Sequence, residues 1–245
     1  MTVSCGDTMP EGINIIIHVN VQKPTTSLPT KKALHVQSRS YWAPANIGPY
    51  SQAIATPIVS NNEEDDTTWA VSVAGQIPLV PATMALPSLN PHSNASITQD
   101  FEFETVLALQ HLWRIGVAMN IAWWTSAAAY LPHGSLAQVQ QRARITGQAW
   151  LRLHAPPPSE AESDDGQERD LWEEKFYAGM EVRTGGKVDT SLPDWDLVSS
   201  SEGGGAAAIP PFFTVEVEEL PRASDVEWHA HLGIAGAAVT VSFSG

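Results

Sequence analysis

The stretch Tyr41-Trp42-Ala43-Pro44-Ala45-Asn46-Ile47-Gly48-Pro49-Tyr50-Ser51-Gln52-Ala53-Ile54 decides the fold, together with Val73-Ala74-Gly75-Gln76-Ile77-Pro78-Leu79 further along the chain. In the first stretch, the Ala-Pro and Gly-Pro pairs favour extended or turned backbone and bring Tyr50 to the start of a predicted strand, residues 51–58. In the second, a β-rich run over residues 69–74 stops at Gly75, where the missing side chain permits close approach of another group. The two stretches therefore predict a pair of strands, with the acidic patch at residues 61–66 as the enlarged tip between them.

The composition fits a globular chain. It has 245 residues, 43% of them hydrophobic, which is enough to bury a core in one or two domains. Its net charge of −14 disfavours nucleic acid as a partner, because phosphate binding needs clustered lysine and arginine. No apolar run is long enough to span a bilayer, no secretory signal is visible, and the single cysteine, Cys5, fits a reducing compartment. We therefore expect a cytoplasmic chain that binds neither membrane nor nucleic acid.

The periodicity of the remaining sequence predicts two helices and three further strands. A helix is expected over residues 96–116, and a second begins at Ser135, with Leu136, Val139, Ile145 and Leu151 as its buried side. The apolar run at residues 120–131 predicts a buried strand, and two closing strands follow at residues 212–219 and 225–234. The predicted order gives an α+β fold, with one mixed β-sheet and two helices packed on one face.

An acidic segment separates the second helix from the closing strands. Residues 156–207 combine proline, glycine and serine with most of the negative charge, a composition typical of a solvated insertion. A short helix is expected near residues 170–177, where Leu171, Trp172 and Phe176 form an apolar side. We therefore predict a partly ordered insertion at residues 156–207 and a C-terminal tail at residues 236–245.

The two stretches quoted first resemble the opening of the Rid (YjgF-like) family, whose members read A-P-x-A-I-G-P-Y-x-Q and then S-G-Q-I-P. The sequence of residues 40–50 is similar in particular to the Rid-like C-terminal region of eukaryotic diphthine–ammonia ligases. The resemblance implies a Rid/chorismate-mutase-like fold for residues 40–235.

A short internal repeat suggests how the chain begins. Residues 9–19 parallel residues 220–230 without a gap, so that Pro10 corresponds to Pro221 and His18 to His229. This predicts that residues 1–22 are the closing hairpin of a preceding Rid-like module and that residues 23–39 are a linker. Chance remains the alternative, because many hairpins carry proline and alternating apolar residues. Whether Met1 is the true start stays open.

The resemblance also implies a site. Rid deaminases hydrolyse enamines and imines derived from amino acids, in a pocket between the subunits of a trimer, and an arginine three residues before Val-Glu-Val binds the substrate carboxylate. Here Phe212 takes that position, Ala74 replaces a serine, Gln140 an asparagine and Thr214 a cysteine, while Tyr50 and Glu227 match. The candidate pocket residues are Tyr50, Ala74, Gly75, Gln76, Gln140, Phe212, Thr214 and Glu227. No residue is assigned as catalytic.

Each candidate also has a purely structural interpretation. Tyr50 can be an aromatic residue at the edge of the core, and Glu227 can face solvent or a subunit interface. His229 and His231 lie on one face of a predicted strand, but no cysteine or carboxylate pattern completes a zinc site, so no metal is expected. The sequence has no Walker loop, no Ser-Gly-Gly-x-Asp-Ser pyrophosphatase loop and no dinucleotide glycine pattern.

Three functions remain open. The first is a Rid-like module that supports ATP-dependent amidation of diphthine on a translation elongation factor; this chain then needs no cofactor, and ATP binds in another domain. The second is an independent Rid-type hydrolase of imines with a rebuilt pocket, and the third is a structural oligomerisation domain. The expected partners are two further copies in a homotrimer, or a tandem Rid-like module, and a diphthine-bearing elongation factor. Phe212 in place of the arginine favours the first function.

Overall fold

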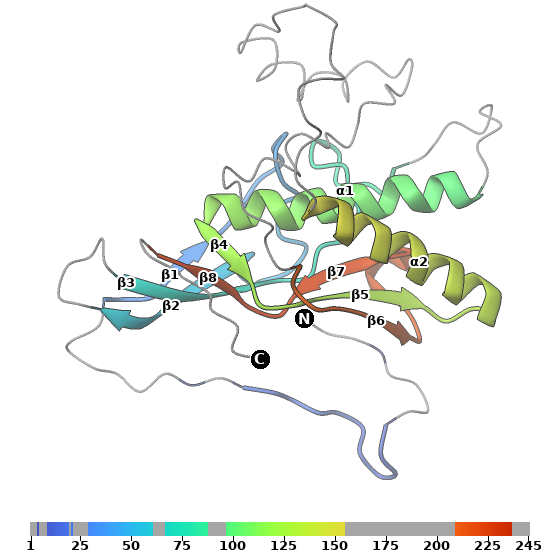
Figure 1. Cartoon of the computed structure of the whole chain (residues 1–245), viewed down its shortest axis with the longest axis horizontal. Coiled ribbons are helices and arrows are strands. Elements are labelled where there is room, and N and C mark those ends of the chain that lie inside the picture. The colour runs from blue at the N-terminus through green and yellow to red at the C-terminus, as the bar shows by residue number, and fades with distance from the viewer. Residues whose placement is uncertain are drawn as a thin grey trace, which may run out of the picture.

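The computed structural model describes residues 4, 9–19, 21, 29–60, 67–87, 97–154 and 209–236 (Figure 1). The acidic patch 61–66, the insertion 156–207, residues 237–245 of the tail and much of residues 1–28 therefore lie outside the described residues. The elements are β1 (Lys32–Leu34), β2 (Ala53–Ser60), β3 (Thr67–Val73), α1 (Ile97–Ala118), β4 (Ile121–Trp124), β5 (Ala127–Pro132), α2 (Leu136–Leu153), β6 (Phe212–Val217), η5 (Pro221–Ala223), β7 (Glu227–Ala230) and β8 (Gly233–Ala235).

The strands form two sheets that continue into each other. One has the order β1-β2-β3-β8-β4 and the other the order β6-β5-β7, and all pairs are antiparallel except β5 with β6. Both β4–β5 and β7–β8 are interrupted at the same level, where the Thr125 amide donates to the Leu232 carbonyl at 2.9 Å and the His231 amide donates to the Ser126 carbonyl at 3.2 Å. The predicted α+β fold with mixed strand directions is confirmed, and the predicted strand at 120–131 is two strands.

Both helices cover the same face of this strand layer (Figure 1). The core lies between them and the strands, and its largest fully buried side chains include Trp150 of α2, Trp228 of β7, and Leu109 and Leu112 of α1. The Trp228 indole Nε1 donates to the Thr105 carbonyl at 3.0 Å, and the Trp150 Nε1 donates to the Pro210 carbonyl at 2.9 Å. These buried indoles therefore tie each helix to the strands while keeping their polar atoms satisfied.

The buried side of α2 differs from the prediction. Ser135 caps this helix, as expected, in a capping box with Gln138. The buried residues are Thr146, Ala149, Trp150 and Leu153, whereas Leu136 and Leu151 are 74% and 52% exposed. Of the four predicted residues, Val139 and Ile145 are half-buried, and the strands contact the neighbouring side of the helix, which contains Trp150.

One strand was not predicted at all. β1 lies within residues 23–39, where the sequence suggested a linker, and it pairs antiparallel with β2 so that Leu34 faces Ala53. Two side-chain bonds from Gln52 extend this pairing: its Oε1 accepts from the Val36 amide at 2.7 Å and its Nε2 donates to the Pro44 carbonyl at 2.6 Å. Within the described part of the chain, no helix is long and apolar enough to cross a membrane.

Candidate functional site

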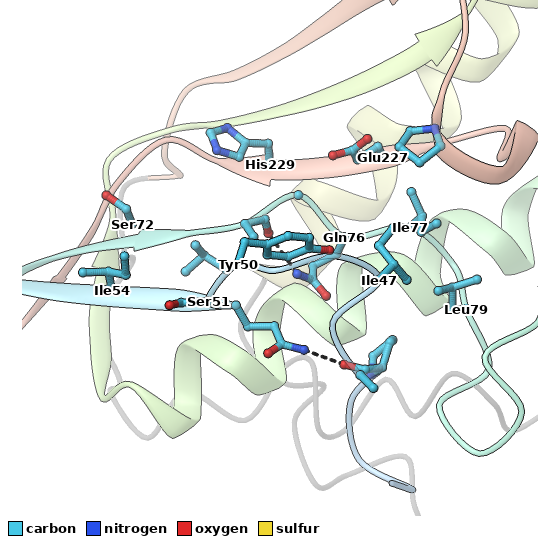
Figure 2. Close-up of a pocket in the computed structure, with 17 residues that line it drawn as sticks. Ile47, Tyr50, Ser51, Ile54, Ser72, Gln76, Ile77, Leu79, Glu227 and His229 are labelled. Atoms are coloured by element: carbon cyan, nitrogen blue, oxygen red, sulfur yellow. Dashed lines mark hydrogen bonds between the residues drawn. The ribbon is translucent and has the colours of Figure 1, made fainter. Parts of the chain in front are cut away.

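A pocket of about 490 Å³ opens where the loop before β2 approaches β7. Figure 2 shows Glu227 and His229 of β7 on one side of this pocket and Tyr50 on the other. The stretch quoted first supplies one wall and the segment after β3 supplies the floor. The lining residues are Pro44, Ala45, Ile47, Tyr50, Ser51, Gln52, Ile54, Ser72, Val73, Ala74, Gly75, Gln76, Ile77, Leu79, Pro221, Glu227 and His229.

β7 separates the pocket from the core by simple alternation. Successive side chains of a strand point to opposite faces, so Glu227 and His229 line the pocket while Trp228 and Ala230 are fully buried in the core. Two backbone bonds fix this register, because the Gln76 amide donates to the Trp228 carbonyl at 2.7 Å and the Trp228 amide donates to the Gln76 carbonyl at 2.8 Å.

The Glu227 carboxylate occupies the space next to Gly75 that a side chain at this position would fill. A Cβ atom built on Gly75 would overlap Glu227 Oε1 and lie 2.8 Å from Glu227 Cδ. The glycine therefore permits the buried carboxyl group to rest against the backbone that follows β3.

The loop before β2 places Tyr50 at the pocket mouth. The Tyr50 amide donates to the Gly48 carbonyl at 2.9 Å, and Asn46 Nδ2 donates to the Tyr50 carbonyl. Burial raises the pKa of the Tyr50 phenol, and the negative charge of Glu227 raises it further. Tyr50 is therefore a neutral phenol at physiological pH, close enough to Glu227 to sense its charge.

Burial also shifts the titration of the two β7 side chains. It raises the pKa of Glu227 from 4.5 to about 7, and it lowers the pKa of His229 to about 4, with the neighbouring His231 lowering it further. No described lysine or arginine lines the pocket. At neutral pH the site thus contains a partly ionised carboxyl group, a neutral imidazole and a neutral phenol. A carboxyl group of this kind can exchange a proton at neutral pH.

The pocket brings together five of the eight candidate residues, namely Tyr50, Ala74, Gly75, Gln76 and Glu227. The other three lie elsewhere in this chain. Gln140 is exposed on α2 and Thr214 is exposed on β6. Phe212 packs its ring against Trp228 at 5.4 Å and Trp150 at 6.3 Å, on the helix side of the strands.

His229 lines the pocket, although its sequence pattern suggested only a metal ligand. Among the described residues no group of three histidine, cysteine, aspartate or glutamate side chains could hold a metal ion. His231 instead uses its Nδ1 in a hydrogen bond with Ser126 Oγ at 2.9 Å. Alternate residues of a strand lie on the same face, and His229 comes two residues after Glu227. This spacing was the sequence feature that could have predicted its place in the pocket.

Two yeast proteins are similar to part of the chain. The diphthine–ammonia ligase of Schizosaccharomyces pombe is 43% identical over 101 residues, which is 41% of this chain and 13% of the ligase. The diphthine–ammonia ligase of Saccharomyces cerevisiae is 36% identical over 107 residues, which is 42% of this chain and 13% of the ligase. The chain therefore spans only a small part of the curated relatives that it matches. No protein-family model matches it.

Solved structures of the Rid family align along most of the chain. The Yersinia pestis Rid protein YyfA is 17% identical, covers 85% of this chain and 100% of its own, and has a TM-score of 0.40. Escherichia coli TdcF with bound serine is 16% identical, the alignment covers 84% of this chain and 99% of TdcF, and the TM-score is 0.39. RidA of an Antarctic Psychrobacter is 15% identical, the alignment covers 82% of this chain and 98% of RidA, and the TM-score is 0.38. The chain thus resembles the Rid family, and in sequence it resembles a part of the diphthine–ammonia ligases.

Proposed function

We propose that this chain is a Rid-like module of a diphthine–ammonia ligase, which supports the ATP-dependent amidation of diphthine to diphthamide on a translation elongation factor without performing it. The observation that carries the proposal is the 43% identity over 101 residues to the Schizosaccharomyces pombe ligase. The sequence contains no phosphate-binding glycine loop, so in this proposal ATP activation belongs to another part of the ligase.

The pocket is the surface through which the module would act. It combines an ionisable carboxyl group, an aromatic ring and apolar walls, which is the composition expected of a small-molecule or side-chain binding site. In this proposal the face that holds Tyr50, Gln76 and Glu227 engages the modified elongation factor in the cytoplasm. The module associates either with two further copies in a trimer or with a tandem Rid-like module.

Hydrolysis of imines is the second candidate, and Glu227 is the observation in its favour. A buried carboxyl group with a pKa of about 7 can activate water. A substrate derived from an amino acid also carries a carboxylate, which must meet a cation when it leaves water. No lysine or arginine lines the pocket in the described part of the chain, and the position of the family arginine holds Phe212. The ligase module is therefore the better supported function.

The decisive experiment deletes the equivalent of residues 40–245 from a full-length ligase and measures diphthamide on the elongation factor in cells. The proposal expects diphthamide to fall, while ATP hydrolysis by the remaining protein persists. A ligase carrying only Gly147→Ala is the control, because a Cβ atom on this α2 glycine makes only an ordinary contact, 3.8 Å from Phe212. Unchanged diphthamide after the deletion, or amidation by the isolated chain given ATP and ammonium, contradicts the proposal.

A further inference from the structure

The pocket contains a buried hydrogen-bond acceptor without a donor. Glu227 is only 5% exposed, and its Oε2 has no hydrogen-bond partner among the described residues. Its other oxygen rests against Gly75, which offers no side-chain donor. Leaving a buried carboxyl oxygen unpaired is costly, and buried polar groups in folded proteins are nearly always hydrogen-bonded. A ligand that donates a hydrogen bond at this point would satisfy Oε2.

The charge of the pocket specifies the kind of donor. The titratable groups that line it are Tyr50 from the loop before β2 and Glu227 and His229 from β7, and none of them is cationic at neutral pH. The segment after β3 contributes only uncharged residues, among them Gln76, whose Nε2 already donates to the Ala74 carbonyl at 2.9 Å. Among the described residues that line the pocket none provides a countercharge, and a positively charged donor would therefore supply one.

The walls next to the carboxyl group are apolar and aromatic. Ile47, Ile77 and Leu79 line the pocket together with the ring of Tyr50, which lies opposite Glu227 in Figure 2. An alkyl chain removes apolar surface from water against such walls, and a cation beside an aromatic ring gains a further electrostatic attraction.

We propose that this pocket binds a primary alkylammonium group, whose N–H donates to Glu227 Oε2 while its carbon chain lies against Ile47, Ile77 and the Tyr50 ring. The proposal goes beyond the function proposed above and does not depend on it, because the lining residues that carry it are described in this chain whatever reaction the module supports. It assigns a ligand class to a site in which Glu227 Oε2 has no hydrogen-bond partner among the described residues.

Three probes of equal chain length test this assignment by nuclear magnetic resonance titration of the whole chain, with the backbone amides of Gly75 and Gln76 as reporters. They are n-butylammonium, neutral 1-butanol, and n-butyltrimethylammonium, which is charged but has no N–H. We expect n-butylammonium to bind tightest, and at least about tenfold tighter than 1-butanol, as for a hydrogen bond to a charged group. Equal binding of 1-butanol, or of the quaternary probe, overturns the proposal.

The dependence on pH distinguishes a bound ammonium from a neutral ligand. An ammonium group pairs with ionised Glu227, so its affinity should be about tenfold higher at pH 8 than at pH 6, given a pKa of about 7. His229 stays neutral across this range, and alkylammonium groups stay charged, so neither contributes to the change. If a protonated carboxyl group instead donated to a neutral ligand, affinity would fall as the pH rises, which would overturn the proposal.

Two variants complete the test. Glu227→Gln keeps the shape of the side chain but removes the charge, and we expect it to lose both the tight binding and the pH dependence. Glu102→Gln, at an exposed position on α1, should bind like the wild type. Circular dichroism verifies that both variants fold. If Glu227→Gln does not fold, the three probes and the pH series on the wild-type chain still test the proposal. The diphthamide assay uses none of these probes, so the two proposals can fail separately.

Discussion

At the scale of single residues, the contact between Gly75 and Glu227 gives the pocket its shape. The glycine lies just after β3, the second strand of the first hairpin, and the carboxyl group fills the space that a side chain would need. The sequence therefore predicted correctly that something approaches closely at Gly75, but it could not identify Glu227, which lies 152 residues further along the chain. The pairing of Gln76 with Trp228 brings these two positions together.

Replacing Gly75 by alanine should lower the free energy of unfolding by about 1–3 kcal/mol, because the new methyl group displaces a buried side chain. Gly147→Ala is the matched control in α2, where the added Cβ meets nothing closer than 3.8 Å. A glycine-to-alanine change inside a helix should raise stability by about 0.5–1 kcal/mol. Urea unfolding of both variants measures the difference, and equal stabilities would show that Glu227 does not require the glycine.

The titration of Glu227 should make stability depend on pH. Its folded pKa of about 7 lies above the ordinary value of 4.5, so folding favours the protonated form. The resulting stabilisation is fully present below pH 4.5 and is lost as the pH rises through 7, up to about 3 kcal/mol in total. Glu227→Gln should therefore gain stability relative to the wild type between pH 5 and pH 8. Unfolding at a series of pH values measures this, and a constant difference would contradict the prediction.

At the scale of elements, the second helix shows which signals are reliable in a sequence. Its start was predicted from Ser135, because a serine side chain can bind the free amides of the first turn, and the structure has this capping box. Its buried face was predicted only in part, because Val139 and Ile145 are half-buried but Leu136 and Leu151 are exposed. The cap depends on neighbouring residues, whereas the buried stripe depends on which side of the helix meets Phe212 and Trp228.

Removing this cap should weaken the helix measurably. We expect Ser135→Ala to lower the free energy of unfolding by about 1 kcal/mol, because the Gln138 amide loses its acceptor. Ser135→Thr keeps the hydroxyl group and should retain most of the stability. Thermal unfolding of the two variants measures the effect. If Ser135→Thr were as unstable as Ser135→Ala, the loss would come from something other than the cap.

At the scale of the whole molecule, the order of elements was predictable and the pocket was predictable in part. Apolar runs gave the strands and helices, yet the apolar run at residues 120–131 could not show a break at Thr125 and Ser126, which follows from pairing with the β7–β8 connection. β1 was not predicted, because Lys32–Leu34 is too short to show the alternation of apolar and polar residues that marks a strand. Tyr50, Ala74, Gly75, Gln76 and Glu227 were predicted as pocket residues and line it, whereas the apolar walls and His229 were not assigned to the pocket from the sequence.

The whole chain should not accelerate the hydrolysis of 2-aminoacrylate. The carboxylate of this enamine finds no lysine or arginine among the described residues that line the pocket, and Phe212 stands at the position of the family arginine. Keto-acid release from freshly generated 2-aminoacrylate, with and without the purified protein, measures this. An unrelated protein at equal concentration is the control. A clear acceleration would restore imine hydrolysis as the leading function.

The alternation along β7 places a restriction on how the preceding turn can change. A slip of β7 by one residue against β5, through a change in residues 218–226, would turn each of its side chains to the other face. The carboxyl group of Glu227 would then enter the layer under the helices, and the indole of Trp228 would fill the cavity. A slip of two residues would keep each side chain on its own face. The connection before β7, in which Leu220, Ser224 and Val226 are buried, therefore decides which side chains enter the pocket without lining most of it.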